Sequence, residues 1–98
     1  MKTIIICDPI YKVGYELLEK EKDIKVIDAS TVSKNELLNM VGDADVAITR
    51  SPTPVDKNFL QAGKKLKAIV RAGVGVDNCD IDECSRRGIV LMNVPTAN

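Results

Sequence analysis

The sequence has no histidine and no tryptophan, and its 98 residues include only two tyrosines and one phenylalanine. Histidine is the most common general acid or base and the usual partner of a nucleophilic serine or cysteine. Its absence excludes catalysis that depends on an imidazole of this chain. Carboxylates and lysines remain, but no pair of them suggests a catalytic arrangement.

An excess of charge of either sign is also missing, since 14 basic residues balance 14 acidic ones. Without a basic surplus, nucleic-acid binding is not expected. No apolar run approaches the roughly 20 residues that a membrane helix needs, and Asp8 follows Met1 too closely for a signal peptide. We therefore predict a single cytoplasmic domain with no nucleic-acid or membrane partner.

The three cysteines are odd in number and irregularly spaced, so they do not form a disulfide framework. Without histidine, Cys79 and Cys84 lack the ligands that would complete a mixed zinc site. Cys7 lies in an apolar segment, where a buried thiol is the usual state. We predict structural roles for all three and no metal site.

Short apolar segments alternate with segments of helical periodicity along the whole chain. The expected strands are 3–7, 24–27, 46–48, 68–71 and 89–92. The expected helices lie between them, over 11–20, 34–41, 57–62 and 81–87, with Ser33, Asp56 and Asp80 as caps, Gly42, Gly63 and Gly88 as stops, and Leu17 and Ile81 facing inward.

Helical connections between apolar strands imply a parallel sheet with helices on both faces. The predicted fold is α/β: a flavodoxin-like, doubly wound, five-stranded parallel sheet of order 2-1-3-4-5 in three layers. No linker or low-complexity segment suggests a boundary inside the chain.

The segment Arg71–Asn78 follows the fourth predicted strand and contains Gly73 and Gly75 one residue apart. Such a glycine pair leaves backbone N–H groups accessible to an anion. Arg50 follows the third strand, and ligands of open parallel sheets bind at the carboxyl ends of the strands. Arg50 and Arg71 could therefore hold a carboxylate or phosphate together.

Simpler interpretations stay open for these residues. Either arginine could be solvated, or could pair with Asp45, Asp77 or Asp80, because surface ion pairs are common and weak. The glycines could merely turn the chain.

Two nucleotide-related interpretations fit poorly. Asn78 stands where a Rossmann fingerprint needs its third glycine, so we do not expect dinucleotide binding at this loop. A phosphoacceptor domain of the receiver type would need paired acids after the first strand and an aspartate after the third, where this chain has Asp8 and Arg50.

Four blocks resemble the N-terminal part of the D-2-hydroxyacid dehydrogenases: Arg50-Ser51, Arg71–Asn78, Arg87-Gly88-Ile89-Val90 and Asn93–Asn98. The resemblance extends over essentially the whole chain. It is greatest to members that oxidise the 2-hydroxyl of a phosphorylated acid in serine biosynthesis. It implies an incomplete substrate-binding domain over 1–98 and a Rossmann domain binding NAD that would follow and that this chain lacks.

The resemblance also implies roles for individual residues toward a small anionic 2-hydroxy or 2-oxo acid. The residues implied in substrate binding are Arg50, Ser51, Arg71, Ala72, Gly73, Val74, Gly75 and Asn98. The amides of 72–75 would receive the carboxylate, and the two arginines would face the carboxylate or the phosphate. Asn98 would also lie near the nicotinamide cofactor.

No catalytic residue is assigned within the chain, because the family's catalytic arginine, glutamate and histidine lie in later segments. The resemblance thus implies an inactive isolated chain, with exposed apolar surface that favours self-association, and a parent enzyme that forms homo-oligomers. The sequence leaves the choice of hydroxy acid and of NAD or NADP open. A stand-alone small-anion-binding or regulatory module and a purely structural domain also remain as alternatives.

Overall fold

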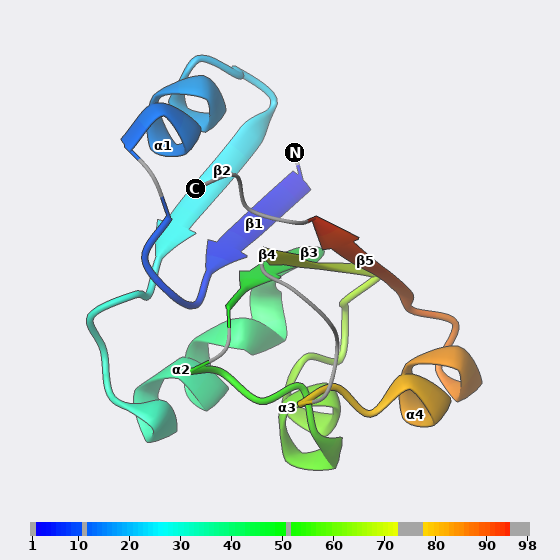
Figure 1. The fold of residues 1–98 in the computed structure, drawn as a ribbon. Coiled ribbons are helices and arrows are strands. Elements are labelled where there is room, and N and C mark those ends of the chain that lie inside the picture. The colour runs from blue at the N-terminus through cyan, green and yellow to red at the C-terminus, as the bar shows by residue number, and fades with distance from the viewer. Residues whose placement is uncertain (1, 11, 51, 73–77, 95–98) are drawn as a thin grey trace.

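The computed structural model describes residues 2–10, 12–50, 52–72 and 78–94. These residues form a five-stranded, all-parallel sheet of order β2-β1-β3-β4-β5, with helices on both faces (Figure 1). The flavodoxin-like order predicted from the sequence is confirmed.

The elements follow one another in strict strand–helix alternation. The strands are β1 (Lys2–Ile6), β2 (Ile24–Asp28), β3 (Val46–Thr49), β4 (Ala68–Ala72) and β5 (Val90–Val94). The helices are α1 (Lys12–Glu19), α2 (Lys34–Met40), α3 (Lys57–Ala62) and α4 (Ile81–Arg86), with a 3₁₀ turn η1 (Val41–Asp43) after α2.

Three helices begin at the side chains that the sequence predicts as caps. The Ser33 hydroxyl accepts a hydrogen bond from the Glu36 backbone N–H at 3.2 Å. The Asp56 and Asp80 carboxylates accept from the N–H groups three residues on, at 2.9 and 3.0 Å. Each such cap contributes about 1 kcal/mol to helix stability. The start of each of these helices is therefore determined by residues close to it in the sequence.

The predicted glycine stops differ from one another in the structure. Gly88 ends α4 with a φ of 72°, in the left-handed region that favours glycine. Gly63 follows α3 with a negative φ, and there a side chain would collide with Leu66. The prediction for Gly42 is wrong, because this residue lies inside η1, which the Ala44 N–H closes onto the Val41 carbonyl at 3.1 Å.

Helices α2, α3 and α4 cover one face of the sheet, and α1 lies on the other face beside β2 (Figure 1). The main core fills the first of these interfaces. Its strand residues include Ile5, Ala47 and Ile69, which share one register row. They pack with helix residues that include Leu37, Phe59, Leu60 and Cys84.

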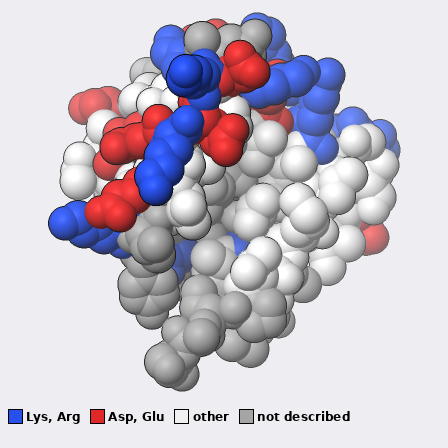
Figure 2. Space-filling view, turned by 90° about the horizontal axis from the view of Figure 1, so that it is seen from above, with Lys and Arg blue, Asp and Glu red and all other residues white. Residues whose placement is uncertain are grey.

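The face that carries α1 is covered unevenly. On this side, charged residues gather over one part of the surface and uncharged residues fill much of the rest (Figure 2). On the edge strand β5, Val90, Met92 and Val94 are 58%, 45% and 49% exposed. The expected exposure of apolar surface is therefore present, at this strand.

Three details of the predicted elements are wrong. Leu17 and Ile81, expected to face inward, are 60% and 49% exposed, because a short helix that packs against the sheet buries only part of its apolar stripe. Strand β5 also continues through Asn93 and Val94, which were expected in a loop. Pairing of these two residues with Arg71 and Ala72 of β4 overrides their turn-like composition.

At the amino edge of the sheet, an aspartate joins the neighbouring strands β1 and β3. The Asp45 carboxylate accepts a hydrogen bond from the Thr3 backbone N–H at 2.8 Å. This bond lowers the pKa of Asp45, and nearby Lys2, Lys65 and Lys67 lower it further. The ionised form therefore contributes stability that is present above the ordinary aspartate pKa and is lost as pH falls through the lowered one.

We expect the Asp45→Asn variant to be less stable than the wild type near neutral pH, and the difference to shrink in acid. Urea unfolding of both proteins between about pH 7 and pH 2 measures this difference. A difference that stays constant over that range would contradict the assignment of the lowered pKa to the folded state.

Candidate anion-binding site

The carboxyl ends of β3 and β4 lie side by side, and Thr49 and Arg71 are partners in the register that joins these strands. Arg50 follows Thr49 directly, so the loop that carries it begins next to the end of β4. The predicted proximity of the two arginine-bearing strand ends is therefore found in the structure. Strand β1 adjoins β3 on its other side, and its own loop meets the same edge.

Arg50 is exposed, but both its backbone and its side chain are held by the loop after β1. Its backbone N–H donates to Asp8 Oδ2 at 2.7 Å. Its guanidinium Nη1 donates to the Pro9 carbonyl at 3.1 Å. These bonds orient a cation at the sheet edge while leaving it accessible.

The Asp8 carboxylate is only 5% exposed and also accepts from the hydroxyl of Thr53, at 2.7 Å between Thr53 Oγ1 and Asp8 Oδ1. Thr53 is itself buried. A buried carboxylate is costly unless its oxygens accept hydrogen bonds. Both oxygens of Asp8 do so, and the carboxylate thereby joins the loops after β1 and β3.

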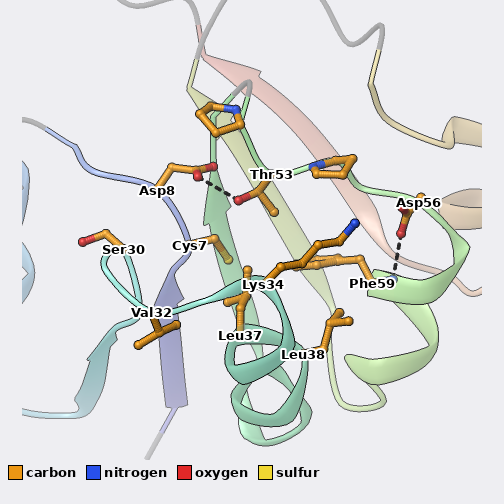
Figure 3. Close-up of a pocket in the computed structure, with 12 residues that line it drawn as sticks. Cys7, Asp8, Ser30, Val32, Lys34, Leu37, Leu38, Thr53, Asp56 and Phe59 are labelled. Carbon is orange, nitrogen blue, oxygen red and sulfur yellow. Dashed lines mark hydrogen bonds between the residues drawn. The ribbon is translucent and has the colours of Figure 1, made fainter.

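A cavity of about 200 Å³ lies beside this contact. Asp8 and Thr53 meet at one end of it, whereas Val32, Leu37 and Leu38 lie at the other (Figure 3). Its remaining lining residues are Cys7, Ser30, Lys34, Pro52, Pro54, Asp56 and Phe59. The cavity therefore lies beneath the loop that carries Arg50, on the side of α2 and α3.

Arg71 is 5% exposed, in contrast to Arg50. Its Nε donates to Asn78 Oδ1 at 2.9 Å. The Asn78 side-chain amide in turn donates to the Thr53 carbonyl at 3.4 Å, and the Asn78 carbonyl accepts from the Val55 N–H at 2.9 Å. Asn78 thus ties the end of β4 to the loop after β3.

The predicted site lies only partly within the described residues. Ser51, Gly73, Val74, Gly75 and Asn98 lie outside the described residues, and Ala72 ends β4 half-buried. Of the acids considered as arginine partners, Asp45 is at the opposite end of β3, where it bonds Thr3. It is therefore not a partner of either arginine at the carboxyl edge.

The sequence places Asp8 and Asn78 at this edge of the sheet, but sequence reasoning gave neither of them, nor Thr53, a role in the site. The sequence does show that Asp8 follows the first strand and that Asn78 replaces a fingerprint glycine. The hydrogen-bond partners of these residues depend on the register between strands that are far apart in the chain. No local sequence pattern reveals this register.

The three cysteines are unpaired thiols. Burial, with a smaller contribution from Asp8, raises the pKa of Cys7 to about 12. Burial also raises the pKa values of Cys79 and Cys84. Such thiols are poor nucleophiles, which agrees with structural roles.

Neither a metal site nor a membrane span stands out in the described part of the chain. Its cysteine and acidic residues form no group of three or more suited to a metal ion. None of its helices is long and apolar enough to cross a membrane.

Residues 4–98 match the family model of the D-isomer specific 2-hydroxyacid dehydrogenase, catalytic domain. The chain belongs to this family. The geometry above is thus that of a family catalytic domain, with its polar residues at the carboxyl edge of the sheet.

Individual relatives are similar over nearly the whole chain. D-3-phosphoglycerate dehydrogenase of Methanocaldococcus jannaschii is 39% identical over 98 residues, which is 100% of this chain and 18% of that protein. Hydroxypyruvate reductase of Thermotoga maritima is 36% identical over 91 residues, which is 93% of this chain and 29% of that protein.

Among solved structures, the NAD⁺-bound 3-phosphoglycerate dehydrogenase of Entamoeba histolytica aligns with a TM-score of 0.79 and 33% identity. The alignment covers 94% of this chain and 32% of that one. The chain therefore spans only a minor part of these relatives' lengths.

One buried polar group at the site edge has no hydrogen-bond partner among the described residues. The hydroxyl of Thr49 is fully buried beside Arg71. An unsatisfied buried hydroxyl costs about 1–3 kcal/mol. We expect Thr49→Val, which has nearly the same shape, to raise the free energy of unfolding by about 1 kcal/mol.

Chemical denaturation measures this change as a shift in midpoint at constant m value. A clear loss of stability in Thr49→Val would contradict the prediction, since it would mean that the hydroxyl makes a stabilising hydrogen bond. Thr53→Val serves as the matched comparison, because that hydroxyl does have a buried partner and its loss should destabilise the protein.

Proposed function

We propose that this chain is the substrate-binding part, still incomplete, of an NAD-dependent D-2-hydroxyacid dehydrogenase that oxidises the 2-hydroxyl of 3-phosphoglycerate. The observation that carries the proposal is the position of Arg50. It is an exposed arginine, oriented by two hydrogen bonds, at the carboxyl edge of a sheet in a member of this family. The similarity to D-3-phosphoglycerate dehydrogenases over the full chain supports the choice of substrate.

In this proposal, different residues bind different groups of the substrate. The amides of Ala72, Gly73, Val74 and Gly75 receive the carboxylate. The side chains of Arg50, Ser51 and Arg71 face the carboxylate or the phosphate, with hydrogen bonds assisted by charge. Asn98 lies near both substrate and cofactor.

The cofactor accepts a hydride from the substrate carbon, and a separate group must take the hydroxyl proton. The glycine pair of this chain is a poor fit to a pyrophosphate, because Asn78 replaces the third glycine and its side chain holds Arg71. We therefore assign NAD binding, and the proton-accepting residue, to a further domain. The parent enzyme would be a homo-oligomer.

A cytoplasmic location is part of the same proposal. Three unpaired cysteines, with no disulfide among them, suit a reducing compartment.

We expect 3-phosphoglycerate to shift the backbone amide resonances of Arg50 and of residues 72–75 when it is titrated into the chain. Arg50→Ala should weaken this binding roughly tenfold, because it removes a hydrogen bond to a charged group. Arg86→Ala is the matched control, since Arg86 is an exposed arginine that pairs with Glu83 on α4. Equal weakening by both variants would leave only general electrostatic attraction and would refute the proposed site.

We also expect the 98-residue chain to produce no NADH when it is mixed with 3-phosphoglycerate and NAD. The physical reason is that it provides neither a complete nicotinamide site nor a group to accept the proton. Absorbance at the NADH maximum is the measurement. Sustained turnover that follows the chain through purification would contradict the proposal.

A further inference from the structure

The loop after β1 contacts the proposed substrate loop through a buried carboxylate for which the proposed function gives no role. Asp8 Oδ2 accepts from the Arg50 N–H and Asp8 Oδ1 accepts from the Thr53 hydroxyl, each at 2.7 Å. These two contacts hold Arg50 and Thr53, which both follow β3. We call the Asp8 carboxylate, the Arg50 N–H and the Thr53 hydroxyl together the Asp8 clamp.

The two contacts of the clamp are joined by shorter-range bonds. The Thr53 N–H donates to the Arg50 carbonyl at 3.2 Å, so the two residues that contact Asp8 are also bonded to each other. The Arg50 guanidinium donates to the Pro9 carbonyl, on the residue next to Asp8. The position of Arg50 is thus fixed by the β1 loop, although the residue itself belongs to the β3 loop.

We propose that Asp8 is a positioning residue for anion binding: through the Asp8 clamp it sets the place and direction of the Arg50 guanidinium toward a phosphorylated 2-hydroxy acid. This inference rests on the proposed function, because it takes Arg50 to be the group that meets the anion. Asp8 itself does not touch the ligand, since it is buried and both its oxygens are engaged.

Because Asp8 is negatively charged, its loss of charge and its loss of hydrogen bonds should change the affinity for an anion in opposite directions. A carboxylate close to an anion site repels the anion, so its removal should by itself strengthen binding. If Asp8 acts by positioning, loss of its hydrogen bonds must weaken binding despite that electrostatic gain. Geometry and charge therefore predict opposite effects of the same substitution.

Two substitutions of Asp8 separate these effects. Asp8→Asn removes the charge but keeps both contacts, because its amide oxygen can accept from the Arg50 N–H and its NH₂ group can donate to the Thr53 hydroxyl. Asp8→Ala removes the charge and both contacts. Thr53→Val is a milder second variant, which removes only one of the two contacts.

The chain also offers a matched control at its other end. Asp45 accepts from the Thr3 N–H at 2.8 Å and joins the same two strands, β1 and β3, at the amino edge of the sheet. Asp45→Ala therefore removes a comparable bond between the same elements, far from Arg50. It should cost stability without changing the affinity for the anion.

The experiment measures 3-phosphoglycerate affinity of the full 98-residue chain and its variants by amide chemical shifts. Asp8→Ala should weaken binding roughly tenfold, Thr53→Val less, and Asp8→Asn should bind at least as tightly as the wild type. Adding Asp8→Ala to Arg50→Ala should cause no further loss, because Asp8 acts through Arg50. Asp45→Ala should bind like the wild type.

The inference is overturned if Asp8→Ala binds as well as the wild type, if Asp45→Ala loses as much affinity as Asp8→Ala, or if the losses of Asp8→Ala and Arg50→Ala add. Should Arg50→Ala bind normally, the proposed function fails instead. Hydrogen exchange at the Arg50 amide then still decides whether Asp8 positions this residue. Exchange that accelerates in Asp8→Ala and not in Asp45→Ala supports the clamp, and unchanged exchange refutes it.

Discussion

The parallel register that joins β1, β3 and β4 is the constraint on which the proposed site depends. It aligns Ile6 with Ile48 and Thr49 with Arg71, so that three chain segments far apart in sequence end at one edge. Because every strand in this sheet runs in the same direction, the loops after β1, β2, β3 and β4 lie at this edge, and each of them precedes a helix. Polar residues gather there without interrupting the apolar core.

Two aspartates fasten the same pair of strands at opposite ends. Asp45 bonds the Thr3 N–H at the amino edge, and Asp8 bonds the Arg50 N–H at the carboxyl edge. The first is stabilised as an anion by surrounding lysines as well as by its backbone bond. The second is buried and joins two loops, so its contacts determine where an exposed arginine lies. The same interaction thus serves stability at one edge and, in our proposal, ligand binding at the other.

Much of this architecture could be predicted because its signals are local. Apolar β-branched runs predicted the strands, and Ser33, Asp56 and Asp80 predicted helix starts that the structure confirms. Predictions failed where tertiary contacts decide, as at Asn93, which pairs with β4 despite its polarity. The prediction that Leu17 and Ile81 face inward was wrong for a related reason. Periodicity shows that a helix has an apolar stripe but not how much of this stripe a neighbouring element covers.

For the site, too, features with a local sequence signal could be predicted, and features that depend on tertiary contacts could not. Arg50 and Arg71 could be found from their places at the carboxyl ends of predicted strands, but their different burial could not. Nor could the bonds from Asp8 to Arg50, or from Asn78 to Arg71, because they depend on side chains from separate loops. The strand order predicts that these loops lie close together. Only the atomic structure shows which of their groups form hydrogen bonds with one another.

In our proposal, the edge formed by the loops after β1, β3 and β4 binds a small organic anion. A crystal structure of the chain grown with 3-phosphoglycerate tests this most directly. The ligand should lie against the Arg50 guanidinium and the backbone amides of 72–75, with Asp8 still bonded to the Arg50 N–H. A ligand found instead in the cavity between Lys34 and Phe59, away from Arg50, would contradict it.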